Sequence, residues 1–322
     1  MDPSVFQATF DGIRSEVERA LLGQSELVEH ALIALLARGH VLLEGAPGLG
    51  KTLLVRLLGQ VLSCQYRRIQ FTPDLMPSDV VGGNVWSQAQ ATFKFIEGPV
   101  FTQLLLADEI NRAPAKTQSA LLEAMQEGQV TVDGVARPLP APFLVMATQN
   151  PIEAQGTYPL PEAQLDRFMF KLSVRPPSYA METAILRSHL AGFDVQALAR
   201  LKLQCIVSPT ALLDMQAFAR AVRVEESIVG YIADIVCRTR AHRSLYYGAS
   251  PRASIALLQG AQVRAASRGR AFAIPDDVKA LAPAVLSHRV GLEPDAEIEG
   301  VSTDDCVAEI LSQVRVPETV AL

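Results

Sequence analysis

The stretch Val41–Thr52 decides the fold of this chain, and it reads Val-Leu-Leu-Glu-Gly-Ala-Pro-Gly-Leu-Gly-Lys-Thr. It fits the phosphate-loop pattern G-x-x-x-x-G-K-[ST] at Gly45, Gly50, Lys51 and Thr52. An apolar run of strand type precedes the loop, and apolar pairs at helical spacing follow it. In a strand–loop–helix unit of this kind, backbone N–H groups and the helix N-terminus face an anion. The sequence therefore predicts a phosphate-binding loop within an α/β fold.

Each residue type in the loop has a chemical task. Glycine lets the backbone turn with positive φ and approach a phosphate without a Cβ in the way. Lys51 would reach the β- and γ-phosphates of a nucleotide, and the Thr52 hydroxyl would bind Mg²⁺. A guanine nucleotide is disfavoured because the chain has no N-K-x-D motif. We therefore expect ATP and Mg²⁺ here, with nucleotide contacts from Gly45, Ala46, Pro47, Gly48, Leu49, Gly50, Lys51, Thr52 and Leu53.

Two further apolar runs end in polar residues and predict neighbouring strands of the same sheet. The run at 104–107 leads into Asp108 and Glu109, and the run at 143–148 leads to Asn150. Such residues lie where open parallel sheets place their ligands. Asp108 would join the Mg²⁺ shell, Glu109 would orient the attacking water, and Asn150 would position the γ-phosphate. A second interpretation stays open, in which the two acids only cap the next helix.

Composition limits the class of protein. The chain has 322 residues, 49% hydrophobic and 20% charged, which is typical of a globular protein with room for two domains. A net charge of −5 gives no global signal for nucleic acid or an anionic membrane. No signal peptide and no apolar run of about 18 residues are evident, so we expect a cytoplasmic protein. The four cysteines are far apart and are predicted to be buried free thiols.

The chain is predicted to divide at a stiff Arg-Pro-Pro-Ser linker near residue 175. Residues 1–175 form the α/β nucleotide-binding domain, and 176–322 are predicted to be helical only. Within the first domain, 72–100 indicates a surface insertion with two short strands. The segment 129–139 indicates a hairpin with an Asp-Gly turn, either a substrate-contacting arm or a covering hairpin. Gly23 and Gln24 either lie on the adenine side of the site or form only a turn between two helices.

Two arginines are candidate phosphate ligands. Arg167 lies among apolar neighbours, and it is either a surface ion pair or, in a multi-subunit ATPase, an arginine finger. Arg252 falls in the first turn of a helix that begins at Ser250-Pro251. A cation is unfavourable at that end of a helix dipole unless an anion is nearby, so Arg252 is a candidate phosphate sensor.

Taken together, these motifs resemble those of the AAA+ ATPases, and more closely the MoxR family. The similarity covers nearly the whole chain. It includes the run Gly-Thr-Tyr-Pro-Leu-Pro-Glu-Ala-Gln-Leu-Asp-Arg-Phe at 156–168. Other matching stretches are Glu44–Thr52, Pro73–Gly82, Glu97–Phe101, Leu104–Gly128, Ala147–Pro151, Gly248–Ala253 and Pro275–Arg289.

The resemblance implies a fold and a set of roles. The fold is a P-loop AAA+ core, a parallel sheet flanked by helices, followed by an all-α lid. By resemblance, 72–100 is the helix-2 insert and 129–139 the pre-sensor-1 hairpin. The implied site residues are Gly45–Thr52 as Walker A, Asp108 and Glu109 as Walker B, Asn150 as sensor 1, Arg167 as arginine finger and Arg252 as sensor 2.

The family also implies partners and an activity. Its members are expected to form hexameric rings with ATP sites between subunits, and to act as chaperone-like remodelers of other protein complexes. A von Willebrand A-domain partner would be a separate polypeptide, because this chain has no D-x-S-x-S motif. Alternatives are a magnesium-chelatase-like metal-insertion subunit, a DNA-translocating AAA+ motor and a nucleotide-gated scaffold without turnover. The acidic composition argues against the DNA motor.

Overall fold

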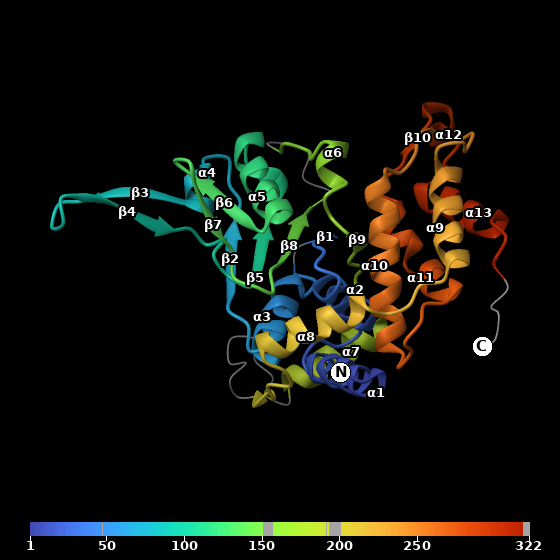
Figure 1. Ribbon diagram of the computed structural model, residues 1–322, viewed down its shortest axis with the longest axis horizontal. Helices are drawn as coiled ribbons and strands as arrows, with labels where there is room; N and C mark the ends of the chain where they lie inside the picture. The colour runs from blue at the N-terminus through green and yellow to red at the C-terminus, as the bar shows by residue number, and fades with distance from the viewer. Residues whose placement is uncertain (47, 151–156, 191, 193–200, 318–322) are drawn as a thin grey trace.

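The computed structural model describes residues 1–46, 48–150, 157–190, 192 and 201–317. A parallel sheet with strand order β2-β5-β8-β1-β9 forms the centre of the first domain (Figure 1). The lid helices stand beside it. The predicted α/β core with a parallel sheet is confirmed. The strands are β1 (Val41–Glu44), β2 (Tyr66–Gln70), β5 (Leu104–Asp108), β8 (Leu144–Gln149) and β9 (Phe170–Ser173).

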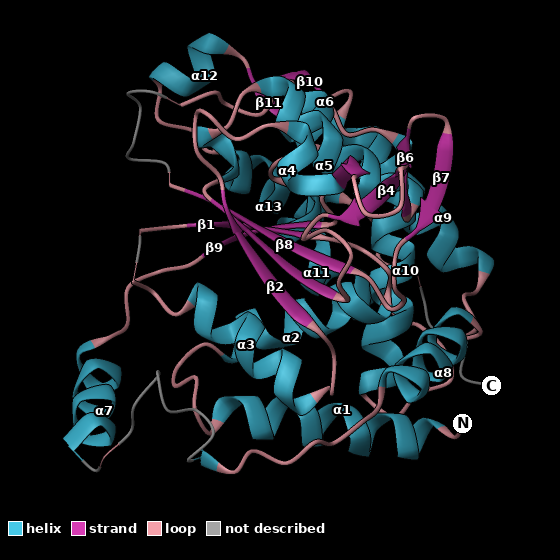
Figure 2. Cartoon of the chain, turned by 90° about the vertical axis from the view of Figure 1, so that its left-hand side faces the viewer, coloured by secondary structure: helices cyan, strands magenta, loops and turns pink. Residues whose placement is uncertain are grey.

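The sheet is covered on both faces, because its central strands are apolar throughout. Along β5, Leu104 and Leu106 pack into a cluster with the N-terminal helices and the lid. The alternate residues Leu105 and Ala107 pack into a second cluster under α5 (Ala115–Glu127). Figure 2 shows the sheet nearly edge-on with helices above and below it. A three-layer core results, and the strand ends remain free to carry polar groups.

The first domain begins with two helices that precede the sheet. Asp2 caps the first of them, since its carboxylate accepts the Ser4 N–H at 2.8 Å. The first three helices begin at Pro3, Ser25 and Lys51. The helical elements of this domain are α1 (Pro3–Glu18), α2 (Ser25–Leu36), α3 (Lys51–Val61), α4 (Pro77–Val81), η1 (Ile110–Arg112), α5 and α6 (Glu162–Leu165).

Both predicted hairpins are confirmed. Strands β3 (Gly82–Ser87) and β4 (Thr92–Glu97) form a ribbon that extends far from the core, and β6 (Gln129–Val132) and β7 (Val135–Pro138) form a shorter one beside it (Figure 1). Two contacts brace the ribbons against each other. An amide N–H of Asn84 donates to the Asp133 carboxylate at 2.6 Å, and the Arg137 guanidinium lies 3.9 Å from the centroid of the Phe95 ring.

The lid is helical, with one correction. Leu245–Tyr247 (β10) pairs antiparallel with Gly291–Leu292 (β11), so the region after residue 176 is not helical only. These strands are too short to give a periodic pattern in the sequence. Ser208, Ser250 and Ser302 cap three of the helices with their hydroxyls. The helices are α7 (Tyr179–Leu190), α8 (Pro209–Arg220), α9 (Glu226–Thr239), α10 (Pro251–Ser267), α11 (Pro275–Leu286), α12 (Pro294–Ile298) and α13 (Thr303–Gln313).

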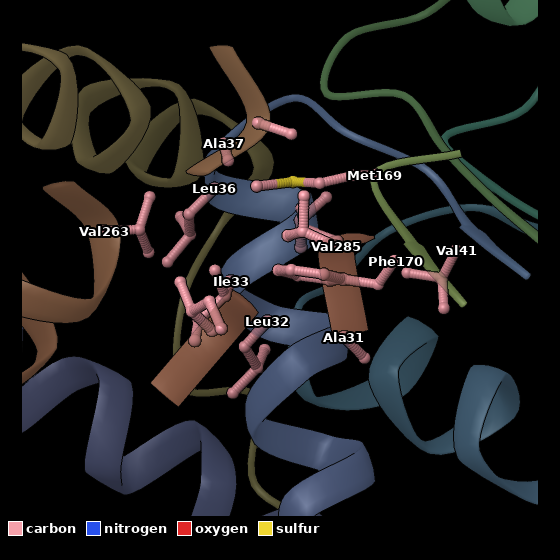
Figure 3. Packing of buried hydrophobic residues seen from close by; sticks show 14 of the residues in the cluster. Ala31, Leu32, Ile33, Leu36, Ala37, Val41, Met169, Phe170, Val263 and Val285 are labelled. Carbon is pink, nitrogen blue, oxygen red and sulfur yellow. The ribbon is translucent and has the colours of Figure 1, made fainter. Parts of the chain in front are cut away.

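Lid and core share one hydrophobic cluster. Figure 3 shows Phe170 of β9 beside Val285 of α11, with Ile33 and Leu36 of α2 nearby. Phe170 is fully buried. The segment that enters β9 is therefore fixed by lid residues as well as by the sheet, and this bears on the polar residues that precede it.

The cysteine prediction is half correct. The four cysteines of the chain are free, but only Cys64 and Cys306 are buried, while Cys205 and Cys237 are exposed. Neither position carried a sequence signal that separates a buried thiol from an exposed one. Among the described residues, none of the helices has the length and apolar character needed to cross a bilayer.

Candidate nucleotide site

A cavity of about 650 Å³ opens at the carboxyl ends of the central strands. Strand β1 delivers the phosphate loop to it, and β5 delivers Asp108 and Glu109. Asn150, directly after β8, reaches the same cavity. The structure thus brings together residues that are more than a hundred positions apart. The predicted loop residues that line the cavity are Gly45, Gly48, Leu49, Gly50, Lys51, Thr52 and Leu53.

Two predicted loop positions fall outside this set. Ala46 does not line the cavity, and Pro47 lies outside the described residues. The loop itself depends on glycine at two turns, since Gly48 and Gly50 both have φ of +83°. Gly50 directly precedes α3, whose first residues are Lys51 and Thr52. The helix N-terminus therefore faces the cavity, as an anion site requires.

Lys51 bridges the loop and the strand ends. Its Nζ donates to the Gly45 carbonyl at 2.6 Å. Burial lowers the pKa of Lys51, and the negative charges of Asp108 and Glu109 act in the opposite direction. A phosphate bound in the loop can replace the Gly45 carbonyl as the hydrogen-bond partner of the Lys51 ammonium.

Asp108 is bound on both oxygens. The Thr148 hydroxyl donates to Oδ1 at 2.6 Å, and Nη2 of Arg68 donates to Oδ2 at 2.7 Å. Arg68 lies on the neighbouring strand β2, and its side chain is 46% exposed. An exposed ion pair of this kind is weak and exchangeable. Asp108 is therefore accessible to a cation that arrives with a nucleotide.

Glu109 is held in an unusual backbone conformation. Its φ and ψ are 56° and 50°, in the left-handed region that few residues with a Cβ adopt. The Glu109 N–H donates to the Thr148 hydroxyl at 2.8 Å. Its carboxylate accepts from Gln70 Nε2 at 2.6 Å and from Arg112 Nη1 at 3.1 Å. Strain of this kind concentrates at functional sites.

The donor set fits a magnesium nucleotide. Mg²⁺ keeps several waters and is bound through one or two protein oxygens together with substrate phosphates. Thr52 and Asp108 supply such oxygens in one cavity. Within the described part of the chain, no cluster of three or more His, Cys, Asp or Glu side chains forms a ligand cage, so an all-protein metal site is not supported.

Sequence reasoning missed three polar residues of this site, namely Arg68, Gln70 and Thr148. Arg68 and Gln70 belong to β2, and alternation along this strand places both on its pocket side. That alternation is the signal that would have found them. Helix α7 also contributes Glu182 and Ile185, which no motif marks.

The two candidates for the adenine side do not both line the main cavity. Gln24 lines the main cavity, whereas Gly23 lines only a neighbouring cavity of about 660 Å³ between core and lid. Apolar side chains suited to a base also line the main cavity. They are Leu21, Leu22, Leu49, Leu53 and Ile185.

The two candidate arginines do not join this cavity. Arg167 and Arg252 line a separate cavity of about 170 Å³, together with Asp166 and Arg289. Arg252 Nη1 lies 3.8 Å from the Asp166 carboxylate. Arg167 also lines a cavity of about 460 Å³ beside α5, and its Nε has no hydrogen-bond partner among the described residues. Neither arginine lines the cavity that holds the phosphate loop of its own chain.

Comparisons with known proteins agree with this geometry. Residues 40–170 match the model of the "ATPase family associated with various cellular activities (AAA)", and 237–310 match that of the AAA lid domain. The Chaperone MoxR1 of Mycobacterium tuberculosis is 44% identical over 316 residues, which cover 95% of this chain and 82% of that protein. The chain belongs to the MoxR family of AAA+ ATPases.

Other relatives of this MoxR-family chain extend over its whole length. An uncharacterised protein of Bacillus subtilis, YeaC, is 46% identical over 301 residues, or 94% of this chain and 92% of its own. A crystal structure from Cytophaga hutchinsonii superposes with a TM-score of 0.90 at 40% identity, and it covers 98% of this chain and 97% of that one. The expected MoxR-type fold, an AAA core followed by an AAA lid, is confirmed.

Proposed function

We propose that this MoxR-family protein hydrolyses ATP and uses the energy to remodel, activate or assemble partner protein complexes. The observation that carries the proposal is the convergence of Lys51, Thr52, Asp108 and Glu109 on one cavity. Each of these residue types has a distinct task in phosphoryl transfer, and that chemistry is mostly positioning and electrostatic stabilisation. Their meeting at the end of a parallel sheet supports turnover as well as binding.

Binding is assigned to the loop and to the first turn of α3. Backbone N–H groups of Gly48 and Gly50 and the N-terminus of α3 would surround the phosphates. Lys51 would exchange the Gly45 carbonyl for a phosphate oxygen. Thr52 and Asp108 would hold Mg²⁺, which neutralises charge on the phosphate oxygens when it is bound. Leu53 and the other apolar side chains of the cavity would contact the base.

The chemical step is assigned to the strand ends. Glu109 would accept a hydrogen bond from water and align it for attack on the γ-phosphate. Gln70 donates to the Glu109 carboxylate at 2.6 Å. This hydrogen bond would hold the carboxylate in place when it is formed and free it when it breaks. Asn150 would donate to the phosphate from the neighbouring strand end.

The positive charge beside the γ-phosphate is assigned to arginines of an adjoining subunit. Arg167 and Arg252 do not line the cavity of their own phosphate loop, which supports a ring in which they meet the neighbour's γ-phosphate. We propose a hexamer on the family resemblance. The β3–β4 ribbon and the β6–β7 hairpin would contact the client, and any von Willebrand A-domain partner would be a separate protein.

Two variants test the proposal. Lys51→Ala should weaken Mg·ATP binding by about 10- to 100-fold, because a charge-assisted contact is lost. Glu109→Gln should bind Mg·ATP normally while kcat falls by ~10²–10⁴-fold. Calorimetric titration with Mg·ATP and phosphate release measure the two effects. Turnover near the wild-type rate by Glu109→Gln, or no change in affinity for Lys51→Ala, would exclude the proposed site.

A further inference from the structure

We propose that Asp166 and Arg289 form a positioning pair that holds Arg167 and Arg252 as one unit for the neighbouring subunit's nucleotide. The proposal deepens the function proposed above and rests on it. Neither Asp166 nor Arg289 would touch the nucleotide. Their task would be to fix the geometry of the two arginines that do.

Arg289 lies three residues beyond the C-terminal end of α11, and its side chain is 3% exposed. Its guanidinium carries five N–H donors in a fixed fork, and each has an acceptor. Nε donates to Asp166 Oδ1 at 2.9 Å. The remaining four donors bind backbone carbonyls of Met169 at 3.2 Å, Val285 at 2.9 Å, Asp166 at 3.1 Å and Phe168 at 2.6 Å.

Three of these carbonyls flank Arg167 in the chain. Asp166 and Phe168 are its direct neighbours, and the His288 Nε2 also contacts the Phe168 carbonyl, at 3.1 Å. Phe168 is fully buried. The backbone is therefore fixed on both sides of Arg167, and Arg167 lines both the cavity beside α5 and the smaller cavity that it shares with Arg252. A finger whose base is fixed in this way loses little entropy when it meets a phosphate.

The Asp166 carboxylate extends the same support to the lid helix α10. The Ser250 hydroxyl, which caps α10, lies 2.9 Å from Asp166 Oδ2, and Arg252 Nη1 lies 3.8 Å from the same oxygen. Arg252 therefore has an anionic partner at the positive end of the helix dipole. One carboxylate therefore contacts Arg289, the Ser250 cap of α10 and the Arg252 side chain.

The consequence is a coupled pair of arginines. Because Arg289 follows α11 and Ser250 caps α10, the lid and the Arg167 segment meet at Asp166. A lid displacement would move Arg167 and Arg252 together. Charge alone cannot replace this arrangement, since a lysine at position 289 has three donors for five acceptors.

The first test uses Asp166→Asn, which keeps the size of the side chain, with Arg289→Lys as a second variant. We expect kcat to fall by ~10²-fold in both, as for a misplacement of about 1 Å, while Mg·ATP affinity stays within about twofold. A loss of affinity comparable to the loss of kcat would overturn the positioning role, because the phosphate loop of the same chain would then be affected.

Subunit mixing is the second and sharper test. Lys51→Ala subunits keep their arginines but lack the phosphate-loop lysine. Mixed with Asp166→Asn subunits they should restore activity, whereas mixing Asp166→Asn with Arg167→Ala should restore none. The reference mixture is Lys51→Ala with Arg167→Ala. If the reference gains activity and the Asp166→Asn mixture does not, the positioning pair is overturned alone. If the reference gains none, the shared site and the pair are both overturned.

A matched control separates positioning from general damage to the lid. Asp277 forms a comparable pair with Arg270, at 2.7 and 2.8 Å, at the other end of α11, and their side chains are 3% and 23% exposed. Asp277→Asn should lower the thermal unfolding temperature at least as much as Asp166→Asn, with kcat within about twofold of wild type. An equal fall in kcat for both variants would show that any weakened lid has this effect, and would overturn the proposal.

Discussion

The nucleotide cavity and the arginine corner, which we define as Asp166, Arg167, Arg252 and Arg289, both contain acids paired with arginines, but they are built differently. In the cavity, the Arg68–Asp108 pair has an arginine that is 46% exposed. In the corner, the Arg289–Asp166 pair has an arginine that is 3% exposed. Burial lowers the pKa of Arg289 to about 10, which still leaves it charged at neutral pH.

The difference indicates what each pair does. An exposed pair contributes little to stability and is easily exchanged, so Asp108 can accept a new partner. Removing one partner of a buried ion pair strongly destabilises the folded protein. A buried pair in which every donor has an acceptor therefore fixes a geometry. We interpret the cavity as the half of the site that changes partners and the corner as the half that holds its shape.

The largest effect on turnover is expected from Arg167, which belongs to the arginine corner. Arg167→Ala should lower kcat by ~10³–10⁵-fold, the range for an arginine finger, with Mg·ATP affinity in the isolated subunit little changed. Phosphate release and a binding titration measure the two quantities. Arg220→Ala, an exposed arginine at the end of α8, is the control and should leave both unchanged. Equal turnover in the two variants would remove Arg167 from the site.

An intermediate effect is expected from His40, which borders the corner. Its Nδ1 accepts the Val145 N–H at 3.0 Å and its Nε2 contacts the Met125 carbonyl at 2.9 Å, so the ring is neutral. Burial lowers the pKa of His40 to about 4. Below pH 6.5 the unfolded chain takes up a proton that the folded chain refuses, and stability falls until about pH 4.

The fall should be ~1.4 kcal/mol per pH unit, or about 3 kcal/mol over this window. It is measured as the free energy of unfolding of wild type and His40→Gln between pH 7 and 4. The two curves should converge as the pH falls. His288, whose pKa burial also lowers, is present in both proteins and cancels in the difference. Parallel curves would contradict the assignment.

The smallest effect is expected in the cavity. Arg68→Gln removes the cation that competes for Asp108, so the Mg²⁺ concentration for half-maximal ATP hydrolysis should fall by about 1.5- to 5-fold, in line with an exposed pair. The measurement is a Mg²⁺ titration of turnover at fixed ATP. A rise in the Mg²⁺ requirement would show that Arg68 assists the site and would remove the contrast with Arg289.

The sequence predicted the parts of this architecture that depend on local pattern. The loop at 45–52, the apolar strand before Asp108 and the serine-capped lid helix at Ser250 follow from spacing and capping chemistry. It also predicted that Asp108 and Asn150 meet, because strand ends in a parallel sheet share one edge. The positions of Arg167 and Arg252 depend on how the lid packs, and no local pattern encodes that. The same limit explains why Asp166 and Arg289 carried no predicted role.

The bracing of the two ribbons has a mechanical consequence. The β3–β4 ribbon follows β2 in the chain, and the β6–β7 ribbon precedes β8. These are the two strands that flank β5, which carries Asp108. Contacts of Asn84 and Arg137 join the two ribbons. A force applied at the exposed Trp86 would therefore act on both β2 and β8, the two strands beside β5. The ribbon that extends into solvent is thus connected to the strands on both sides of Asp108.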